Sequence, residues 1–131
     1  MQSPWKYFSL EELKCKCGQC GSTGIEMDND FMERLIELRK ECGFAFPVSS
    51  GYRCPKHNAA VSKTSFDGPH TTGKTIDILI SGSNAYLLVK KALIHGFTGI
   101  GINQKGEHGK RFIHLDTLET PDYPRPAIWS Y

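Results

Sequence analysis

Two stretches of the chain hold the histidines and the carboxylate that most restrict how it can fold. The first, residues 49–77, includes His70 and Asp77, and the second, residues 111–116, includes His114. Two imidazoles and one carboxylate form a set of three zinc ligands that leaves a fourth coordination position open for water. If these side chains bind one ion, the fold must bring the two distant stretches together.

The residues around Asp77 predict a buried strand. Residues 74–80 contain three isoleucines and a leucine, which is typical of such a strand, and alternation places Asp77 on the opposite face from the isoleucines. A buried acid needs a cationic or metal partner, and His114 is also flanked by apolar residues. Taken alone, the spacing of His70 and Asp77 is a weak signal, and it is better explained by a surface-loop histidine and a buried structural acid.

Hydrophobic periodicity and capping signals predict several short helices and strands. Ser9 caps a short helix that ends before the first cysteines, and apolar residues at helical spacing predict a helix that is capped at Asp28 or Asn29 and ends at Cys42. Further helices are expected over 56–63 and 84–95, and strands over 46–49, 74–80, 97–102 and 111–115. The tail, residues 120–131, is expected to lack regular structure because of its prolines. These elements predict an α+β fold with a small, mainly antiparallel sheet packed by helices.

Length and charge limit the classes of function. A chain of 131 residues suits one domain, with residues 1–24 as an N-terminal helix and Cys-rich loop and residues 25–131 as the core. The net charge of +2 is too small to favour nucleic acid as a partner. No apolar run reaches the length of a membrane span. The N-terminus lacks the pattern of a signal peptide, so we expect synthesis in the cytoplasm, and we expect a monomer.

A cluster of cysteines indicates a possible second metal site. The five cysteines of the chain are Cys15, Cys17, Cys20, Cys42 and Cys54. The first three are close enough in sequence to bind one structural zinc, which usually takes four ligands, and Cys42, Cys54 or His57 is the candidate for the fourth. The alternative is a set of free thiols, or one disulfide, in a surface loop.

Four motifs together resemble a known family. The runs S-G-Y-R-x-x-x-H-N, H-x-x-G-x-x-x-D, G-I-G and F-I-H-L-D, in this order, are similar to the zinc-dependent D-alanyl-D-alanine peptidases of the M15 type. The hedgehog signalling domain shares the fold of these peptidases. The resemblance covers roughly residues 8–129, and it implies that His70, Asp77 and His114 bind Zn²⁺. It also implies a D,D-carboxypeptidase or endopeptidase that acts on peptidoglycan stem peptides, as phage endolysins do.

A zinc hydrolase also needs a group that moves a proton. Asp116 lies two residues after His114 on the same face of the expected strand, so it either takes the proton from water or orients His114. Related zinc peptidases have an acid just before the last ligand, where this chain has Arg111. His108 and Glu107, in the preceding turn, are the next candidates for the catalytic base.

Arg53 is the candidate residue for binding the substrate. The resemblance places this arginine near the zinc, where its guanidinium offers a fixed fork of donors to a carbonyl or carboxylate; the alternative is a surface arginine in a turn. Trp129 either closes over the core or forms a wall of the cleft, and packing in the core is the favoured expectation.

Two hypotheses of function follow. The first is a zinc metallopeptidase that is synthesised in the cytoplasm and acts on the cell wall, with delivery by a phage or prophage as one route. The second is a zinc-containing binding module of the same fold without turnover, a reading that the arginine at position 111 favours.

Overall fold

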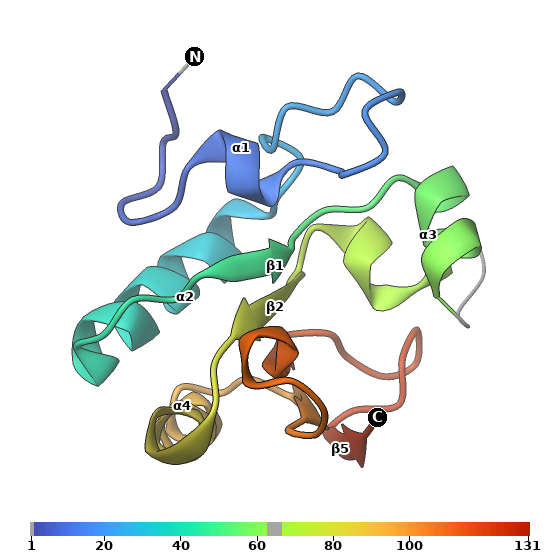
Figure 1. Cartoon of the computed structure of the whole chain (residues 1–131). Coiled ribbons are helices and arrows are strands. Elements are labelled where there is room, and N and C mark those ends of the chain that lie inside the picture. Colours follow the sequence, from blue (N-terminus) through green and yellow to red (C-terminus); the bar gives the residue numbers. More distant parts are fainter. Residues whose placement is uncertain (1, 63–66) are drawn as a thin grey trace.

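The structure, a computed structural model, describes residues 2–62 and 67–131 as four helices, two short 3₁₀ turns and five strands (Figure 1). The helices are α1 (Leu10–Leu13), α2 (Asn29–Cys42), α3 (Pro55–Val61) and α4 (Gly82–Ile94). The 3₁₀ turns are η2 (Pro69–Thr72) and η3 (His108–Lys110). The strands are β1 (Val48–Ser50), β2 (Thr75–Leu79), β3 (Gly99–Asn103), β4 (Phe112–Asp116) and β5 (Ala127–Ser130). The expected helices and strands are therefore present, and Lys63, expected to end the third helix, lies outside the described residues.

The strands form one sheet in the order β1-β2-β4-β3-β5. The pairs β1–β2, β2–β4 and β3–β4 are antiparallel, and β5 runs parallel to β3. The predicted α+β class with a mainly antiparallel sheet is confirmed. The central position of β2 and β4 matters most for function, because these two strands carry Asp77 and His114 side by side in register.

Local capping explains where the first two helices begin and end. Ser9 and Glu12 form the expected capping box of α1, with each side chain bonded to the other residue's backbone. The Asp28 side chain accepts a hydrogen bond from the backbone N–H of Phe31, and Gly43 ends α2 in the left-handed conformation. The residues that α2 buries are Phe31, Met32, Leu35 and Leu38.

The two faces of the sheet have different roles. The apolar residues of one face belong to the same core cluster as the buried residues of α2 and α4; they are Ile76, Ile78, Ile100, Ile113 and Leu115. The opposite face of β2 and β4 carries Asp77, His114 and Asp116, all of which are buried. The helices therefore stabilise the sheet from one side, and the other side is free to hold polar groups.

The expectation that the tail lacks regular structure was wrong for its last residues. Ala127–Ser130 forms β5, whose N–H and C=O groups pair with the edge of β3. The prolines of the tail all precede this strand, so four consecutive residues have the N–H groups that a ladder requires. The pairing sets Trp129 opposite Gly101, beside His114.

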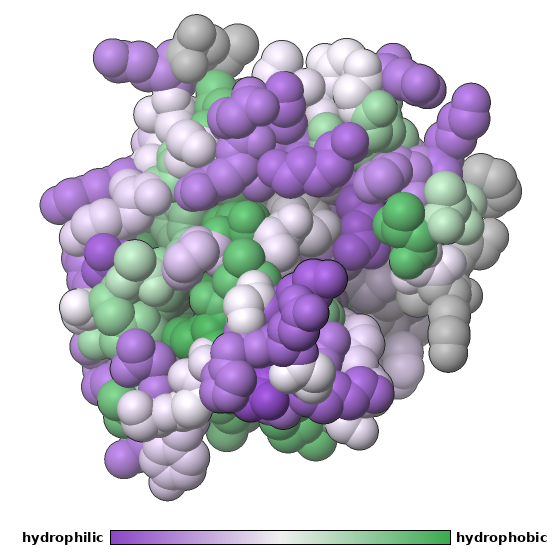
Figure 2. All heavy atoms as spheres, in the orientation of Figure 1, coloured by the Kyte–Doolittle hydropathy of each residue, from purple (hydrophilic) through white to green (hydrophobic). Residues whose placement is uncertain are grey.

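The surface is largely hydrophilic in the view of Figure 2, with hydrophobic residues showing mainly beside β1. Within residues 2–62 and 67–131, no helix combines the length and the apolar character that crossing a membrane requires.

Candidate metal centre

Three predicted ligands meet at one point on the polar face of the sheet. His70 comes from η2, Asp77 from the middle of β2 and His114 from the middle of β4, and each is at most 5% exposed. His70 Nε2 lies 3.2 Å from one Asp77 carboxylate oxygen, and His114 Nδ1 lies 3.1 Å from the other. One ligand atom from each residue lies within 4.8 Å of the others, which is close enough for a single ion.

In each imidazole, the ring nitrogen that does not face Asp77 contacts a hydrogen-bond acceptor. His70 Nδ1 lies 2.8 Å from the backbone carbonyl of Gly51, and His114 Nε2 lies 2.7 Å from Asp116 Oδ2. A ring nitrogen that donates to such an acceptor leaves the lone pair on the other nitrogen of a neutral ring. Both lone pairs then point toward Asp77, so the donor set fits a divalent metal ion.

The charges of the centre also suit a metal. Burial raises the pKa of Asp77, but the nearby His70 and His114 outweigh it and hold that pKa well below its ordinary value. Burial lowers the pKa of His114, but hydrogen bonds to Asp116 and Asp77 outweigh it and raise that pKa. Asp77 is thus ionised at neutral pH, and a metal would displace the proton that the two carboxylates attract to His114.

A cleft of 820 Å³ opens onto the three ligands. Arg53 lines one part of it, and the tail residues Tyr123, Arg125, Trp129 and Tyr131 line another. The volume is in the range of cavities that bind a small ligand or a short peptide segment.

The expectation that Trp129 packs in the core was wrong. Its ring is partly exposed and lies 4.9 Å, between centroids, from the His114 ring, so it forms a wall of the cleft. The parallel pairing of β5 with β3 puts the indole on the polar face of the sheet, away from the core cluster.

A comparison with protein families identifies the chain. The sequence model of the family Peptidase M15 matches residues 6–116, a range that includes all three ligands. The chain belongs to the M15 peptidase family. The comparisons with curated proteins and with solved structures gave no match. M15 peptidases are metal-dependent, in agreement with the ligand group on the sheet.

Asp116 of this M15 peptidase is enclosed by donors. It is fully buried, and its oxygens accept hydrogen bonds from His114 Nε2, from Nε and Nη2 of Arg125 at 3.0 and 2.8 Å, and from the Leu118 N–H at 3.3 Å. Burial raises its pKa, but His114 and Arg125 outweigh burial and lower the pKa to about 2. These contacts favour the orienting role over the proton-accepting role, because so weak a base with no free lone pair accepts a proton poorly.

Arg53 lies beside the metal ligands in the M15 site. Its Nη2 is 3.9 Å from Asp77 Oδ2, and its other nitrogens donate to Ser50 Oγ and Asn58 Oδ1, both at 3.2 Å. Its backbone N–H also donates to the His70 carbonyl at 3.0 Å. The guanidinium is therefore fixed at the edge of the cleft, where a substrate oxygen can reach it.

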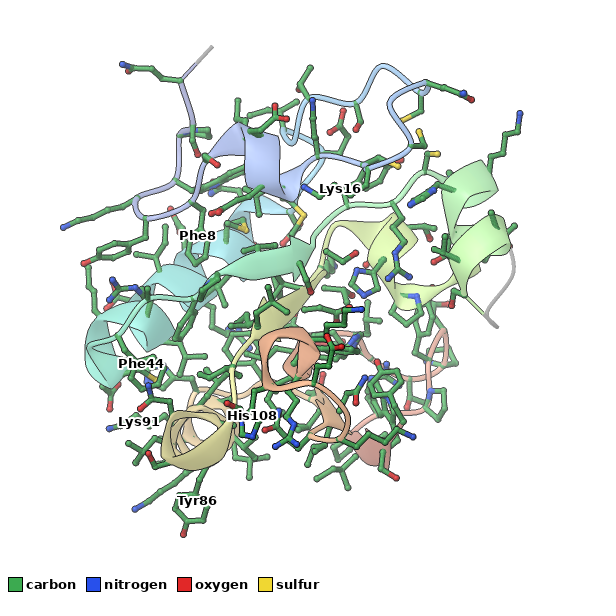
Figure 3. The ribbon with its side chains drawn as sticks, in the orientation of Figure 1. Phe8, Lys16, Phe44, Tyr86, Lys91 and His108 are labelled. Carbon is green, nitrogen blue, oxygen red and sulfur yellow. The ribbon has the colours of Figure 1, made fainter. Side chains whose placement is uncertain are left out.

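The other two candidates for the base of the peptidase lie elsewhere. Glu107 precedes η3 and His108, labelled in Figure 3, is its first residue. Both are exposed, and neither is among the described residues that line the cleft. Sequence reasoning missed four residues that line the cleft, Asp67, Tyr123, Arg125 and Tyr131. The sequence signal that points to these tail residues is the basic and aromatic content of the tail, which a coil without a function does not require.

Gly101 makes room for the M15 centre. A Cβ at this position would lie 2.7 Å from Trp129 Nε1 and 2.9 Å from His114 Cβ, closer than real Cβ contacts allow. We expect Gly101→Ala to lower the free energy of unfolding by about 1–3 kcal/mol, because overpacking forces neighbours to shift, and to weaken metal binding. Thermal unfolding with and without metal measures both effects.

The matched control is Gly109→Ala, since an added Cβ at Gly109 meets nothing within 4 Å. If Gly101→Ala and Gly109→Ala lowered the free energy of unfolding equally, the close approach of β3 to His114 and Trp129 would not explain the glycine at position 101.

Proposed function

We propose that this M15 peptidase is a zinc metallopeptidase that hydrolyses D-Ala-containing peptide bonds in the stem peptides of bacterial peptidoglycan. The observation that carries the proposal is the convergence of His70, Asp77 and His114 at the floor of a cleft, within the range that matches the family. The site then acts at the cell wall, on a free or cross-linked peptide.

Zinc is the ion that these donors suit best. Two imidazole nitrogens and one carboxylate are a common set in catalytic zinc sites, which keep one position open for water or substrate. Bound there, the ion would lower the pKa of water and polarise the peptide carbonyl. His70 would offer Nε2 and His114 Nδ1, because Gly51 and Asp116 already occupy their other nitrogens.

The chain's own groups orient the peptide. Arg53 stands at the edge of the cleft and offers a charged donor to the carbonyl that is cut or to a terminal D-Ala carboxylate. Trp129 provides an apolar wall next to His114, against which a D-Ala methyl group can pack. Asp116 and Arg125 keep His114 in one tautomer and one orientation.

We expect Arg53→Ala to lower kcat/KM for a wall peptide about 100- to 1000-fold while the metal content stays unchanged. A donor that stabilises developing charge typically contributes about 3–4 kcal/mol to the transition state, and Arg53 is not one of the three ligands. Steady-state kinetics and elemental analysis of the same preparation measure the two quantities.

Arg53→Lys keeps the positive charge but loses the forked N–H donors of the guanidinium, so its rate should lie between those of Arg53→Ala and the wild type. Arg39→Ala is the matched control, because Arg39 lies on α2 over the Tyr7 ring, outside the cleft. Equal losses of metal and of activity in Arg53→Ala would mean that Arg53 holds the site together and does not act on substrate.

The experiment that tests the proposed function is digestion of purified peptidoglycan with and without a chelator, with the released products identified by mass spectrometry. Release of free D-Ala indicates a carboxypeptidase, and conversion of cross-linked peptides into single stem peptides indicates an endopeptidase. The proposal requires that cleavage stops with chelator and returns with added zinc.

The second hypothesis, a binding module without turnover, also has an observation in its favour. Among the described residues that line the cleft, the only acidic side chains are those of the candidate ligand Asp77 and the exposed Asp67. Wall peptides that bind in a zinc-dependent way but stay intact would support the binding module and overturn the peptidase.

A further inference from the structure

A second group of metal-binding side chains lies away from the cleft, where the N-terminal loop meets the start of α3. Its members are Cys15, Cys17, Cys20 and Cys54, and their sulfur atoms all lie within 4.8 Å of one another. Figure 3 shows sulfur atoms gathered between the N-terminal loop and α3. Three of these residues are close in sequence, and the fourth comes from the arm that follows β1.

The distances between the sulfur atoms match a shared ion. Cys54 Sγ lies 3.6 Å from Cys15 Sγ and 3.8 Å from Cys17 Sγ. Four sulfurs around one tetrahedral zinc, each with a bond of about 2.3 Å, lie about 3.8 Å from one another. A disulfide needs about 2.05 Å between its sulfurs, and all five cysteines of the chain are free in the structure.

Backbone N–H groups donate to these sulfurs. The N–H of Gln19 points to Cys17 Sγ at 3.4 Å, and the N–H of Cys54 points to Cys15 Sγ at 3.3 Å. The N–H of His57 donates to Cys54 Sγ at 3.4 Å and so caps α3. Such donors stabilise the thiolate form, the form of cysteine that binds a metal.

We propose that Cys15, Cys17, Cys20 and Cys54 form a closed, structural zinc site, separate from the centre on the sheet. Four thiolates satisfy the tetrahedral preference of zinc and leave no position for water or substrate. Of the two other candidates for the fourth ligand, Cys42 lies on α2 and His57 donates only its backbone N–H to the cluster. Neither belongs to the group that converges.

The place of this site in the fold indicates what it does. The N–H of Tyr52 donates to the Leu13 carbonyl at 2.9 Å, so the N-terminal segment already pairs with the arm after β1. That arm carries Gly51, whose carbonyl orients His70, and Arg53, which stands next to Cys54. A zinc ion on Cys54 anchors the arm to the N-terminal loop, and it thereby positions Arg53 and His70 without touching the substrate.

The test uses the full chain, purified under reducing conditions without chelator. Elemental analysis should give two zinc ions per chain, and zinc-edge X-ray absorption should show a zinc–sulfur distance of about 2.3 Å. Cys20 is exposed, so Cys20→Ser removes a ligand without opening the core, and it should lose one zinc together with the sulfur signal. His70→Ala should lose the other zinc and keep the sulfur signal.

Cys42→Ser is the matched control, because it removes a thiol outside the group and should keep both ions. The proposal is overturned if Cys20→Ser keeps two zinc ions, if the wild type shows no sulfur neighbour to zinc, if iron replaces zinc, or if thiol counting in denaturant finds a disulfide among the four. These readouts do not depend on catalysis. A protein that shows the sulfur signal but leaves wall peptides intact would therefore contradict the proposed function alone.

Discussion

His70→Ala and His114→Ala should each lose one zinc ion per chain and, with it, cleavage of wall peptides. Each substitution removes one of the three candidate ligands found among the described residues, and it leaves Asp77 with a single imidazole partner. Losing an outer hydrogen-bond partner of a ligand already costs about 10- to 100-fold in metal affinity, and losing the ligand itself should cost more. Elemental analysis after dialysis and rates of peptide cleavage measure the two losses.

The control for both variants is His95→Ala, at the end of α4, where the imidazole pairs with Glu41 outside the cleft. It should keep both the metal and the rate. Zinc content that stays unchanged in His70→Ala and in His114→Ala would rule out the ligand assignment. Loss of the metal with full activity would instead mean that the zinc does not take part in peptide hydrolysis.

Asp116→Asn should lower metal affinity about 10- to 100-fold, with a matching loss of activity. The aspartate accepts from His114 on one oxygen and from Arg125 on both. An asparagine has only one acceptor oxygen, so its NH₂ group must face donors. The substitution also leaves Arg125 without a charged partner, and it allows His114 to carry its proton on Nδ1, the nitrogen that must face the metal.

Zinc titration monitored by competition with a chelating dye, together with rates at saturating zinc, separates the two roles considered for Asp116. If Asp116 were the proton acceptor, the variant would keep its zinc affinity and lose about 100-fold or more in rate. Asp122→Asn, an exposed acid of the tail, is the matched control. If neither affinity nor rate changes, His108→Ala and Glu107→Gln become the tests for the base.

The sheet and its helices were predictable because their signals are local. The helical spacing of the apolar residues in α2 and the serine cap of α1 can be recognised without knowledge of the rest of the chain. β5 was missed for the opposite reason. Among the described strands, β5 pairs only with the edge of β3. No local pattern in a proline-rich tail reveals an edge that becomes available only after the sheet has formed.

The same contrast between local sequence signals and tertiary contacts applies to the candidate site. The motifs indicated His70, Asp77 and His114, and the register of β2 against β4 brings Asp77 and His114 together. The contact between Asp116 and Arg125 was not predicted, because it joins the end of β4 to a tail loop. The family motifs therefore indicated the candidate ligands, whereas the groups that enclose them depend on tertiary contacts.

The most direct test of the central claim is anomalous diffraction at the zinc edge from crystals of the protein purified with zinc. The account predicts a peak bonded to His70 Nε2, an Asp77 oxygen and His114 Nδ1, with bonds of about 2.0–2.2 Å and with His114 Nε2 still donating to Asp116. The absence of a peak at these three residues in zinc-loaded crystals, or a zinc bound through His114 Nε2 in place of Nδ1, would contradict it.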